Sequence, residues 1–407
     1  MVPEGWEIKA LKDILSSPIR NGFSPIASDK ETGFWVLGLG SLGDEGINVT
    51  EIKPVEPTDR VLQTKLSHGD FLVSRSNTPD KVGRSIYFRG EIENCSYPDL
   101  MMKFRVDESK AYPPFIEQKL KSFDVRAFFK NCAAGSSATM VKINKVILEK
   151  TPLLLPNIKE QKKIVQVLST WDKAIVTTEQ ILANSQQQKK ALMQQLLTGK
   201  NRFQEYDNEW SNYFLNQLFD FKKGKGLSKA TLASNGRKCI LYGELYTKYG
   251  EVITHVVSRT AENDGFTSKI GDILIPSSTT TTGIDLSNAT AILEDQVLLG
   301  GDINVLRPKK KINSVFMAYL LTHIKKKDIA SRAQGITIIH LYGSDLKTIK
   351  VFIPESITEQ EKIVTTLLAF DNEIEILKQK LNNLKQEKKA LMQQLLTGKR
   401  RVKVEAA

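Results

Sequence analysis

The chain has 407 residues, a net charge of +12 and a pI near 9.3, which favours an acidic partner such as nucleic acid. No apolar run approaches the ~18 residues of a membrane-spanning helix, and the first twelve residues lack the apolar segment of a secretory signal. Three scattered cysteines, Cys95, Cys132 and Cys239, argue against a disulfide framework or a cysteine zinc site and favour a cytoplasmic location.

Residues 1–153 are predicted to form a first β-rich domain. Short β-branched or aromatic runs, such as residues 34–37, 71–73 and 85–88, alternate with turns rich in Gly, Asn, Asp and Ser. The segment has 21 Lys+Arg and 20 Asp+Glu, so it is almost neutral. If this domain binds DNA, its basic groups must gather on one surface.

A long helix is expected within residues 154–200. Pro156 precedes it and Thr198-Gly199 ends it. Residues 201–352 then repeat the β-rich pattern with the same landmarks: Trp210 matches Trp6, 271–274 matches 69–72, and 335–337 matches 135–137. The two domains otherwise differ in sequence.

Residues 353–407 hold a second long helix and the C-terminal tail. The twelve residues 388–399, KKALMQQLLTGK, are identical to residues 189–200. Such a repeat shows that the chain consists of two similar halves. Apolar residues at alternating spacings of four and three predict a coiled-coil seam, interrupted in the first helix by Thr178 and Ser185. The predicted seam comprises Ile164, Leu168, Trp171, Ile175, Leu182, Ile363, Leu367, Phe370, Ile374, Leu377, Leu381 and Leu384.

Three short motifs are typical of enzymes, but each lacks a necessary part. The GxGxxG of residues 38–43 is followed by turn and strand residues rather than a nucleotide-binding helix. Residues 112–115 resemble an amino-methyltransferase loop, but Tyr112 replaces the Asn or Asp that would accept from the target amine. A nuclease-like pattern at residues 98–110 has no counterpart in the second half, and the four histidines form no close pair. We therefore expect neither a catalytic nor a metal site.

Polar and basic loops are the remaining candidates, and they suit DNA. Lysines among glycines at residues 222–229 suit phosphate contacts, while Arg and Asn can read base edges and Ser and Thr suit mixed contacts. The candidate DNA-binding residues are Arg20, Arg75, Asn77, Lys81, Arg84, Lys103 and Arg105 in the first domain and Lys222, Lys223, Lys225, Lys229, Arg237, Ser277, Ser278, Thr279 and Thr280 in the second. For any single residue, a solvated surface loop remains an equal alternative.

The whole chain resembles the specificity subunit of type I restriction-modification systems. The resemblance rests on two unlike β-rich domains, each followed by Pro, three or four residues, Glu-Gln-x-x-Ile and a long helix ending in Leu-Leu-Thr-Gly-Lys. It implies an α+β fold in which two target recognition domains alternate with two helices that pair antiparallel, with pseudo-two-fold symmetry. Each domain would read one half of a bipartite site on double-stranded DNA, and the helices would set the gap.

The resemblance also implies partners. Two modification (methyltransferase) subunits would dock on the helices, and restriction (motor and endonuclease) subunits would join them. Adenine methylation, ATP-dependent cleavage and the cofactors S-adenosylmethionine, ATP and magnesium would belong to those partners, so this chain itself would bind no cofactor. Two rival hypotheses remain at this point: a self-contained methyltransferase or nuclease, and a structural protein whose coiled coil joins two chains.

Overall fold

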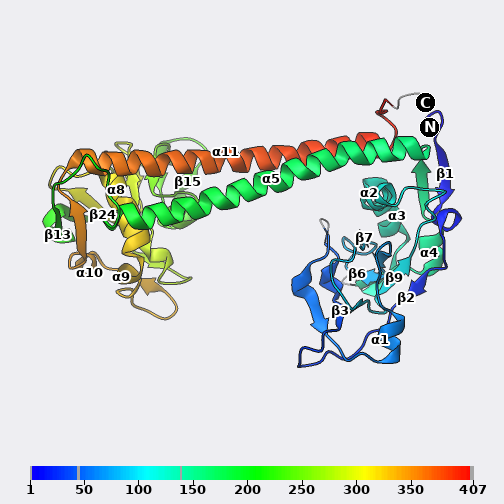
Figure 1. The fold of residues 1–407 in the computed structure, drawn as a ribbon. Helices are drawn as coiled ribbons and strands as arrows, with labels where there is room; N and C mark the ends of the chain where they lie inside the picture. The colour runs from blue at the N-terminus through cyan, green and yellow to red at the C-terminus, as the bar shows by residue number, and fades with distance from the viewer. Residues whose placement is uncertain (1, 44–45, 138–139, 404–407) are drawn as a thin grey trace. The chain divides into compact units, whose positions relative to one another are not determined.

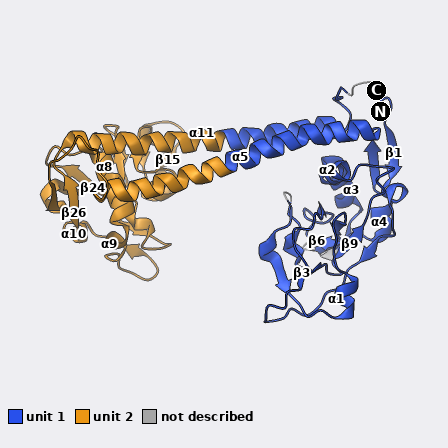
Figure 2. Ribbon diagram, in the orientation of Figure 1, with its two compact units in different colours: residues 1–179, 380–407 blue, residues 180–379 orange. Residues whose placement is uncertain are grey.

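The computed structural model describes residues 2–43, 46–137 and 140–403. The chain divides into two compact units, unit 1 (residues 1–179 and 380–407) and unit 2 (residues 180–379) (Figure 2). Each unit contains one β-rich region and parts of the long helices α5 (Ile158–Leu196) and α11 (Ile357–Leu396) (Figure 1). Among the helices of the described residues, none has the length and apolar character that a membrane crossing requires.

Both long helices begin and end with the same local signals. Asn157 Oδ1 accepts from the Glu160 backbone N at 2.9 Å, and Ser356 Oγ accepts from the Glu359 backbone N at 3.3 Å, so each helix has a side-chain N-cap. At their ends, Gly199 and Gly398 adopt φ of +69° and +68°. This left-handed conformation favours glycine and terminates an α-helix.

Helices α5 and α11 pair antiparallel (Figure 1). In unit 1, Lys388 near the end of α11 contacts Asp172 in the first half of α5 at 2.5 Å. In unit 2, Lys189 near the end of α5 forms the equivalent ion pair with Asp371 of α11. The seam lysines, the polar positions of the heptad pattern, thus each find a carboxylate on the opposite helix, which fixes the register of the pair.

Every predicted seam residue is buried or half-buried, although Ile164 and Leu367 are far better covered than Leu381 and Leu384. Thr178 and Ser185, which interrupt the apolar pattern, are also buried in the seam. Thr178 Oγ1 donates to the Ala174 carbonyl at 2.8 Å, and Ser185 Oγ donates to Glu373 of α11 at 3.0 Å. These hydrogen bonds satisfy the two hydroxyls, so the seam continues through both positions.

The Glu-Gln pair at the start of each helix joins that helix to its surroundings. Gln161 donates to the Pro156 carbonyl and accepts from the Tyr112 backbone N, both at 2.8 Å. Gln360 makes the same two contacts in unit 2, with Pro354 and Asn313, also at 2.8 Å. Both glutamines are buried, so their amides satisfy backbone groups that water cannot reach.

Each Glu of this pair binds an arginine that follows the other helix. Glu160 of α5 makes a bidentate pair with Arg401 at 2.7 and 2.8 Å in unit 1. Glu359 of α11 makes the same pair with Arg202, both contacts at 2.8 Å, in unit 2. Bidentate Arg–carboxylate contacts are strong and directional. They hold the end of one helix against the start of the other in both units.

The β-rich region of unit 1 contains a four-stranded sheet of order β2-β9-β5-β7, a three-stranded sheet β4-β3-β8, a three-stranded sheet β10-β11-β6 and the pair β1-β12. The strands are β1 Glu7–Ala10, β2 Arg20–Asn21, β3 Trp35–Leu37, β4 Ile52–Pro54, β5 Phe71–Ser74, β6 Ser76–Asn77, β7 Ser85–Tyr87, β8 Cys95–Ser96, β9 Met101–Phe104, β10 Ala134–Ser137, β11 Met140–Lys142 and β12 Pro152–Leu155. The short helices are α1 Asp59–Gln63, α2 Pro113–Lys121, α3 Phe123–Cys132 and α4 Lys145–Glu149.

Unit 2 repeats this plan with longer sheets. They have the orders β14-β24-β20-β22-β17 and β15-β18-β16-β23-β19, with the pairs β21-β25 and β13-β26. The strands are β13 Trp210–Phe214, β14 Phe219–Lys223, β15 Leu232–Ala233, β16 Arg237–Ile240, β17 Val252–Ile253, β18 Arg259–Thr260, β19 Phe266–Thr267, β20 Ile273–Pro276, β21 Ser278–Thr279, β22 Thr290–Ile292, β23 Leu298–Leu299, β24 Ile303–Pro308, β25 Ile339–His340 and β26 Lys350–Pro354. The short helices are α6 Leu215–Leu218, α7 Glu244–Thr247, α8 Ser314–Tyr319, which continues as a π-helix over Leu320–Ile324, α9 Lys326–Ala330 and α10 Gly343–Leu346.

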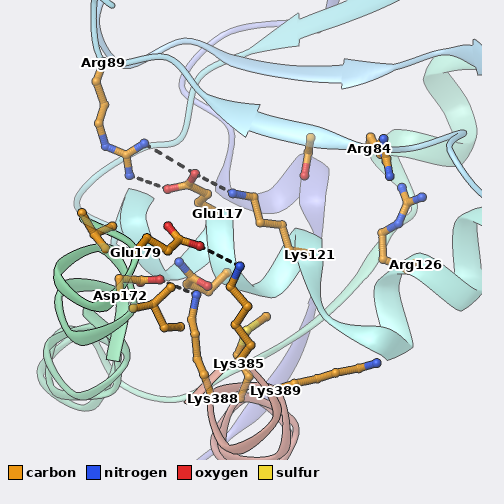
Figure 3. A pocket seen from close by; sticks show the side chains of 15 residues that line it. Arg84, Arg89, Glu117, Lys121, Arg126, Asp172, Glu179, Lys385, Lys388 and Lys389 are labelled. Atoms are coloured by element: carbon orange, nitrogen blue, oxygen red, sulfur yellow. Dashed lines mark hydrogen bonds and ion pairs between the residues drawn. The ribbon is translucent and has the colours of Figure 1, made fainter. Parts of the chain in front are cut away.

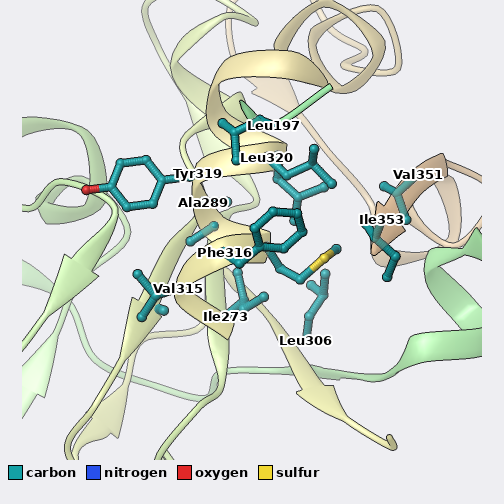
Figure 4. Close-up of a cluster of buried hydrophobic side chains, with 14 of the residues drawn as sticks. Leu197, Ile273, Ala289, Leu306, Val315, Phe316, Tyr319, Leu320, Val351 and Ile353 are labelled. Atoms are coloured by element: carbon teal, nitrogen blue, oxygen red, sulfur yellow. The ribbon is translucent and has the colours of Figure 1, made fainter. Parts of the chain in front are cut away.

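In each unit one hydrophobic core joins the β-rich region to the long helices. In unit 2, Phe316 of α8 and Ile273 of β20 share a cluster with Leu197 and Leu367 (Figure 4). In unit 1, Phe115 of α2 belongs to the equivalent cluster with Ile164 and Leu396. The predicted α+β architecture, two β-rich regions alternating with two antiparallel helices, is confirmed. Because the helices pair within the chain, a coiled coil joining two chains is not needed to bury their seams.

Candidate nucleic-acid interface

Several predicted basic residues lie on the edge strands of the two main sheets. Arg20 is exposed on β2, and Lys222 and Lys223 are exposed on β14. Each of these strands pairs with one neighbour, β9 or β24, so the equivalent edge carries positive charge in both units. Long exposed lysines and arginines at a sheet edge can reach phosphates without disturbing the fold.

The remaining basic candidates of unit 2 have different surroundings. Lys225 and Lys229 are exposed, and Lys225 lies 3.9 Å from Asp264. Arg237 is half-buried and donates to the carbonyls of Asn263 and Gln296 at 2.7 and 3.3 Å. The guanidinium of Arg237 therefore connects two loops, whereas the lysines point to solvent.

In unit 1, Lys103 and Arg105 are held by a buried carboxylate. Asp70, in the Gly-Asp landmark before β5, accepts from Arg105 Nε at 2.6 Å and from Lys103 Nζ at 3.3 Å. Unit 2 repeats this contact with Asp272 and Arg307, at 2.9 and 2.7 Å. The two basic side chains of unit 1 thus neutralise a buried acid, a role that sequence reasoning did not assign to them.

The segments after β5 and β20 are less accessible than the sequence suggested. Asn77 of β6 is buried and donates to Ser74 Oγ at 3.5 Å, while β6 pairs with β11. Ser277, Ser278 and Thr279 are also buried, and β21 pairs with β25. Thr280 is the first exposed residue of this run. The buried residues position the neighbouring loops, and their side chains do not face solvent.

Arg75, Lys81 and Arg84 belong to the loop that joins β5 to β7. Lys81 is exposed, while Arg75 and Arg84 are half-buried. The backbone of Arg75 bonds to Leu100 and Ile143, so this residue lies between the start of β9 and the end of β11. Arg84 lies at the mouth of a cavity that also involves α2 and the long helices.

Unit 2 has a constrained loop tip at the glycine landmark near the end of its domain. In unit 2, Gln334 and His340 exchange backbone hydrogen bonds of 2.9 and 2.7 Å around Gly335. Gly335 has φ +127°, and a Cβ there would lie 2.1 Å from the Ile338 carbonyl oxygen. The following residue, Ile336, is 99% exposed. A large apolar side chain is thus presented to solvent on a turn that only glycine permits.

The equivalent glycine of unit 1 is Gly135, where a Cβ would lie 2.6 Å from the Met140 carbonyl oxygen. It lies on β10, which forms a hairpin with β11, and residues 138–139 at the end of that hairpin lie outside the described residues. Sequence reasoning matched the two glycines but did not treat their loops as candidates for DNA contact. The sequence feature that could have indicated these loops is the shared glycine, which is followed by Ser136 in one half and by Ile336 in the other.

Reactive chemistry is not evident in the described parts of the chain. No group of three His, Cys, Asp or Glu side chains there lies close enough to hold a metal ion. Burial raises the pKa of the Cys95 thiol to about 12 and that of Cys239 to about 11. Neither thiol is a nucleophile near neutral pH, because the thiolate is the reactive form.

Comparisons with known proteins agree with this geometry. The family model described as type I restriction modification DNA specificity domain matches residues 3–184 and 207–386, one copy for each half. The chain is 26% identical, over 99% of its length and 95% of the relative's, to a putative type I restriction enzyme MjaX specificity subunit of Methanocaldococcus jannaschii. It is 27% identical to the MjaVIII specificity subunit of the same organism, over 71% of this chain and 70% of that one.

Solved structures share the fold. A chain from work on complex assembly and conformational transition of the type I R-M system has a TM-score of 0.62 at 14% identity, covering 97% of this chain and 98% of that one. The S subunit from M. genitalium has a TM-score of 0.55 at 17% identity, with coverage of 97% and 96%. With both halves matched by the family model, the chain belongs to the DNA specificity subunits of type I restriction-modification systems, non-catalytic subunits with two target recognition domains.

Proposed function

We propose that this specificity subunit reads a bipartite site on double-stranded DNA, one half with each recognition domain. The domains would extend over residues 1–153 and 201–352, with helical segments at 154–200 and 353–407. The observation that carries the proposal is the contrast within the repeat. The helices share an identical twelve-residue segment, whereas the residue after the shared glycine is Ser136 in one domain and Ile336 in the other. Two similar frames with different residues at such positions suit two different half-sites.

The DNA contacts divide into two chemical kinds. The exposed Arg20, Lys222 and Lys223 at sheet edges would bind phosphates and set the position of each domain. Exposed Lys81, Lys225, Lys229 and Thr280 extend this set, with the half-buried Arg75, Arg84 and Arg237 beside it. Ile336 would make apolar contact with base edges such as a thymine methyl group. Asn77, Ser277, Ser278 and Thr279 would support the reading loops from within, and Lys103 and Arg105 would hold Asp70.

The paired helices would set the gap between half-sites and dock two modification subunits. Two similar helix pairs, one in each unit, would offer two docking surfaces, as pseudo-two-fold symmetry requires. Restriction subunits would join this complex. S-adenosylmethionine, ATP and magnesium would bind to the partners, and the complex would act in the cytoplasm. One solved relative comes from work on the assembly of such a system.

The test replaces the exposed tip residue of one domain. In cells that contain this chain and its modification subunit, Ile336→Ser is expected to relax or change one half of the methylated motif and leave the other half intact. Loss of a good base contact costs roughly 1–3 kcal/mol of discrimination. Modified-base sequencing of genomic DNA measures both halves at once.

Ile270→Ser is the matched control. Ile270 is also exposed, but it precedes β20, whereas the tip packs beside β21 at the other end of that strand. The control should leave the motif unchanged. If Ile336→Ser also leaves both halves of the motif unchanged, the tip does not read DNA.

A further inference from the structure

Unit 1 contains a charged cavity between its recognition domain and the paired helices (Figure 3). Its volume is about 650 Å³. Arg84, Arg89, Lys121 and Arg126 line it from the domain, and Lys385, Lys388 and Lys389 line it from α11. Three acids, Glu117, Asp172 and Glu179, complete the charged lining. Seven basic groups against three acidic groups leave an excess of positive charge.

The internal repeat allows this cavity to be compared with unit 2, where a larger side chain occupies the equivalent position. Gln161 and Gln360 make matching contacts with the backbone N of Tyr112 and Asn313, which aligns α2 with α8. Six residues after these contacts, unit 1 has Gln118 and unit 2 has Tyr319. Gln118 is half-buried and lines the cavity.

In unit 2 the side chain of Tyr319 covers the ion pair that Lys189 and Asp371 form in the helix seam. Tyr319 is buried, and its hydroxyl donates to Asp371, the partner of Lys189. The Lys189 ammonium lies 5.3 Å from the centre of the Tyr319 ring, and the rings of Tyr319 and His323 stack with their centres 6.1 Å apart. In unit 1, the equivalent pair of Lys388 and Asp172 lines an open cavity instead.

The acids of the cavity are already engaged by bases. Glu117 accepts from Arg89 at 2.5 Å and from Lys121 at 3.0 Å. Burial alone would raise the pKa of Glu117, but the hydrogen bonds and charges of these two bases hold it below its usual value. Lys385 pairs with Glu179 at 2.7 Å. Each acid of the lining thus pairs with a base of the same lining, and the bases outnumber the acids.

The lining of this cavity also contains a neutral hydrogen-bond donor. Ser85 lines the cavity and is 3% exposed, and no hydrogen-bond partner for its hydroxyl oxygen occurs among the described residues. A buried hydroxyl without a partner costs free energy unless a ligand or water satisfies it. Together with the surrounding ammonium and guanidinium groups, this hydroxyl fits an oxygen-rich anion.

We propose that this cavity of unit 1 is a phosphate-binding site that unit 2 lacks. The phosphate would come either from the backbone of bound DNA or from a free phosphate compound. As a backbone site it would strengthen binding without regard to sequence, because phosphate contacts carry no base information. The site is separate from the loop tips proposed to read bases.

The experiment uses the full chain and two variants. Gln118→Tyr introduces the side chain that closes the equivalent position in unit 2, and Lys389→Gln removes an exposed positive charge of the cavity without disturbing the core. Lys380→Gln is the control, since it removes an exposed positive charge from α11 outside the cavity. Each protein is titrated with inorganic pyrophosphate by calorimetry, and with a duplex lacking the recognition site by fluorescence anisotropy at several salt concentrations.

The proposal expects both variants, unlike the control, to weaken at least one ligand by about threefold or more. A lost backbone contact should also reduce the slope of log affinity against log salt by about 1. Weaker duplex binding identifies DNA as the phosphate source, and weaker pyrophosphate binding alone identifies a free compound. If Lys389→Gln and a folded Gln118→Tyr match the control with both ligands, the phosphate site does not exist. Because the duplex carries no recognition site, this result would leave the proposed base reading untouched.

Discussion

Lys119 shows how one buried charge can join a recognition domain to the helix pair. Its side chain is fully buried, and its ammonium donates to Asp124 at 2.6 Å and to the Leu396 carbonyl at 2.9 Å. Burial lowers the pKa of Lys119, an effect that the nearby Asp124 carboxylate opposes. The Leu396 carbonyl belongs to the last turn of α11, where positive charge is favourable. Leu320 occupies the equivalent position in unit 2.

Replacing this lysine should destabilise unit 1. Lys119→Met keeps much of the volume but leaves Asp124 and the Leu396 carbonyl without their buried partner. We expect a loss of about 3 kcal/mol, the lower end for a broken buried ion pair, because the Asp124 side chain is 45% exposed. Urea unfolding followed by tryptophan fluorescence measures it, since Trp6, Trp35 and Trp171 all lie in unit 1.

Two outcomes of that measurement are informative. Adding Asp124→Asn should recover part of the loss, because the unpaired charge is then removed. A single variant within about 0.5 kcal/mol of the parent protein would contradict the role of Lys119, since surface substitutions without structural consequence fall in that range.

At the scale of elements, the glutamine at the start of each long helix links that helix to its domain. Gln161→Leu leaves the Tyr112 backbone N and the Pro156 carbonyl unpaired in a buried site. Each unsatisfied group costs roughly 1–3 kcal/mol, so we expect a loss of about 2–6 kcal/mol of unit 1 stability. Chemical denaturation with the same fluorescence signal provides the value.

Gln360, the equivalent glutamine of unit 2, provides a matched variant, and an exposed glutamine of α5 provides a control. Gln360→Leu should destabilise unit 2 by a similar amount, and the two losses should add in the double variant because the sites share no partners. Gln166→Leu, at an exposed position of α5, should change stability by less than about 0.5 kcal/mol. A Gln161→Leu protein as stable as this control would show that the buried amide contributes nothing.

The elements predictable from sequence were those defined by local pattern. Heptad spacing and the Thr-Gly ends predicted both long helices, because a helix depends on residues three and four positions apart. The recognition domains depend on distant partners. Asp70 binds Arg105, 35 positions away, and Ser278 pairs with His340, 62 positions away. No local pattern revealed that these contacts would bury Ser278 and engage Arg105.

The cavity and the loop tips were hidden from sequence for a similar reason. Gln118 and Tyr319 become comparable only when Gln161 and Gln360 align their helices in space. Ile336 looked like an ordinary apolar residue, and only the turn around Gly335 exposes it. The proposed roles of these residues depend on their three-dimensional surroundings, which sequence periodicity does not contain.

At the scale of the whole molecule, the internal repeat links fold and function. Two recognition domains share a common frame, and in each unit the same Glu-Gln and Arg contacts link the domain and the long helices. Under the proposed function, the two similar units would match two copies of a partner and two half-sites of DNA. The differences between the halves, such as Gln118 against Tyr319, would then give each unit its own properties.

The most direct test of this account is modified-base sequencing of genomic DNA from cells that express the chain with its neighbouring methyltransferase, compared with cells that lack only the chain. The account predicts a new methylated-adenine motif in two parts separated by a fixed gap, present only with the chain. If no chain-dependent motif occurs while the methyltransferase is active and bound to the chain, the chain does not direct that methyltransferase to a sequence.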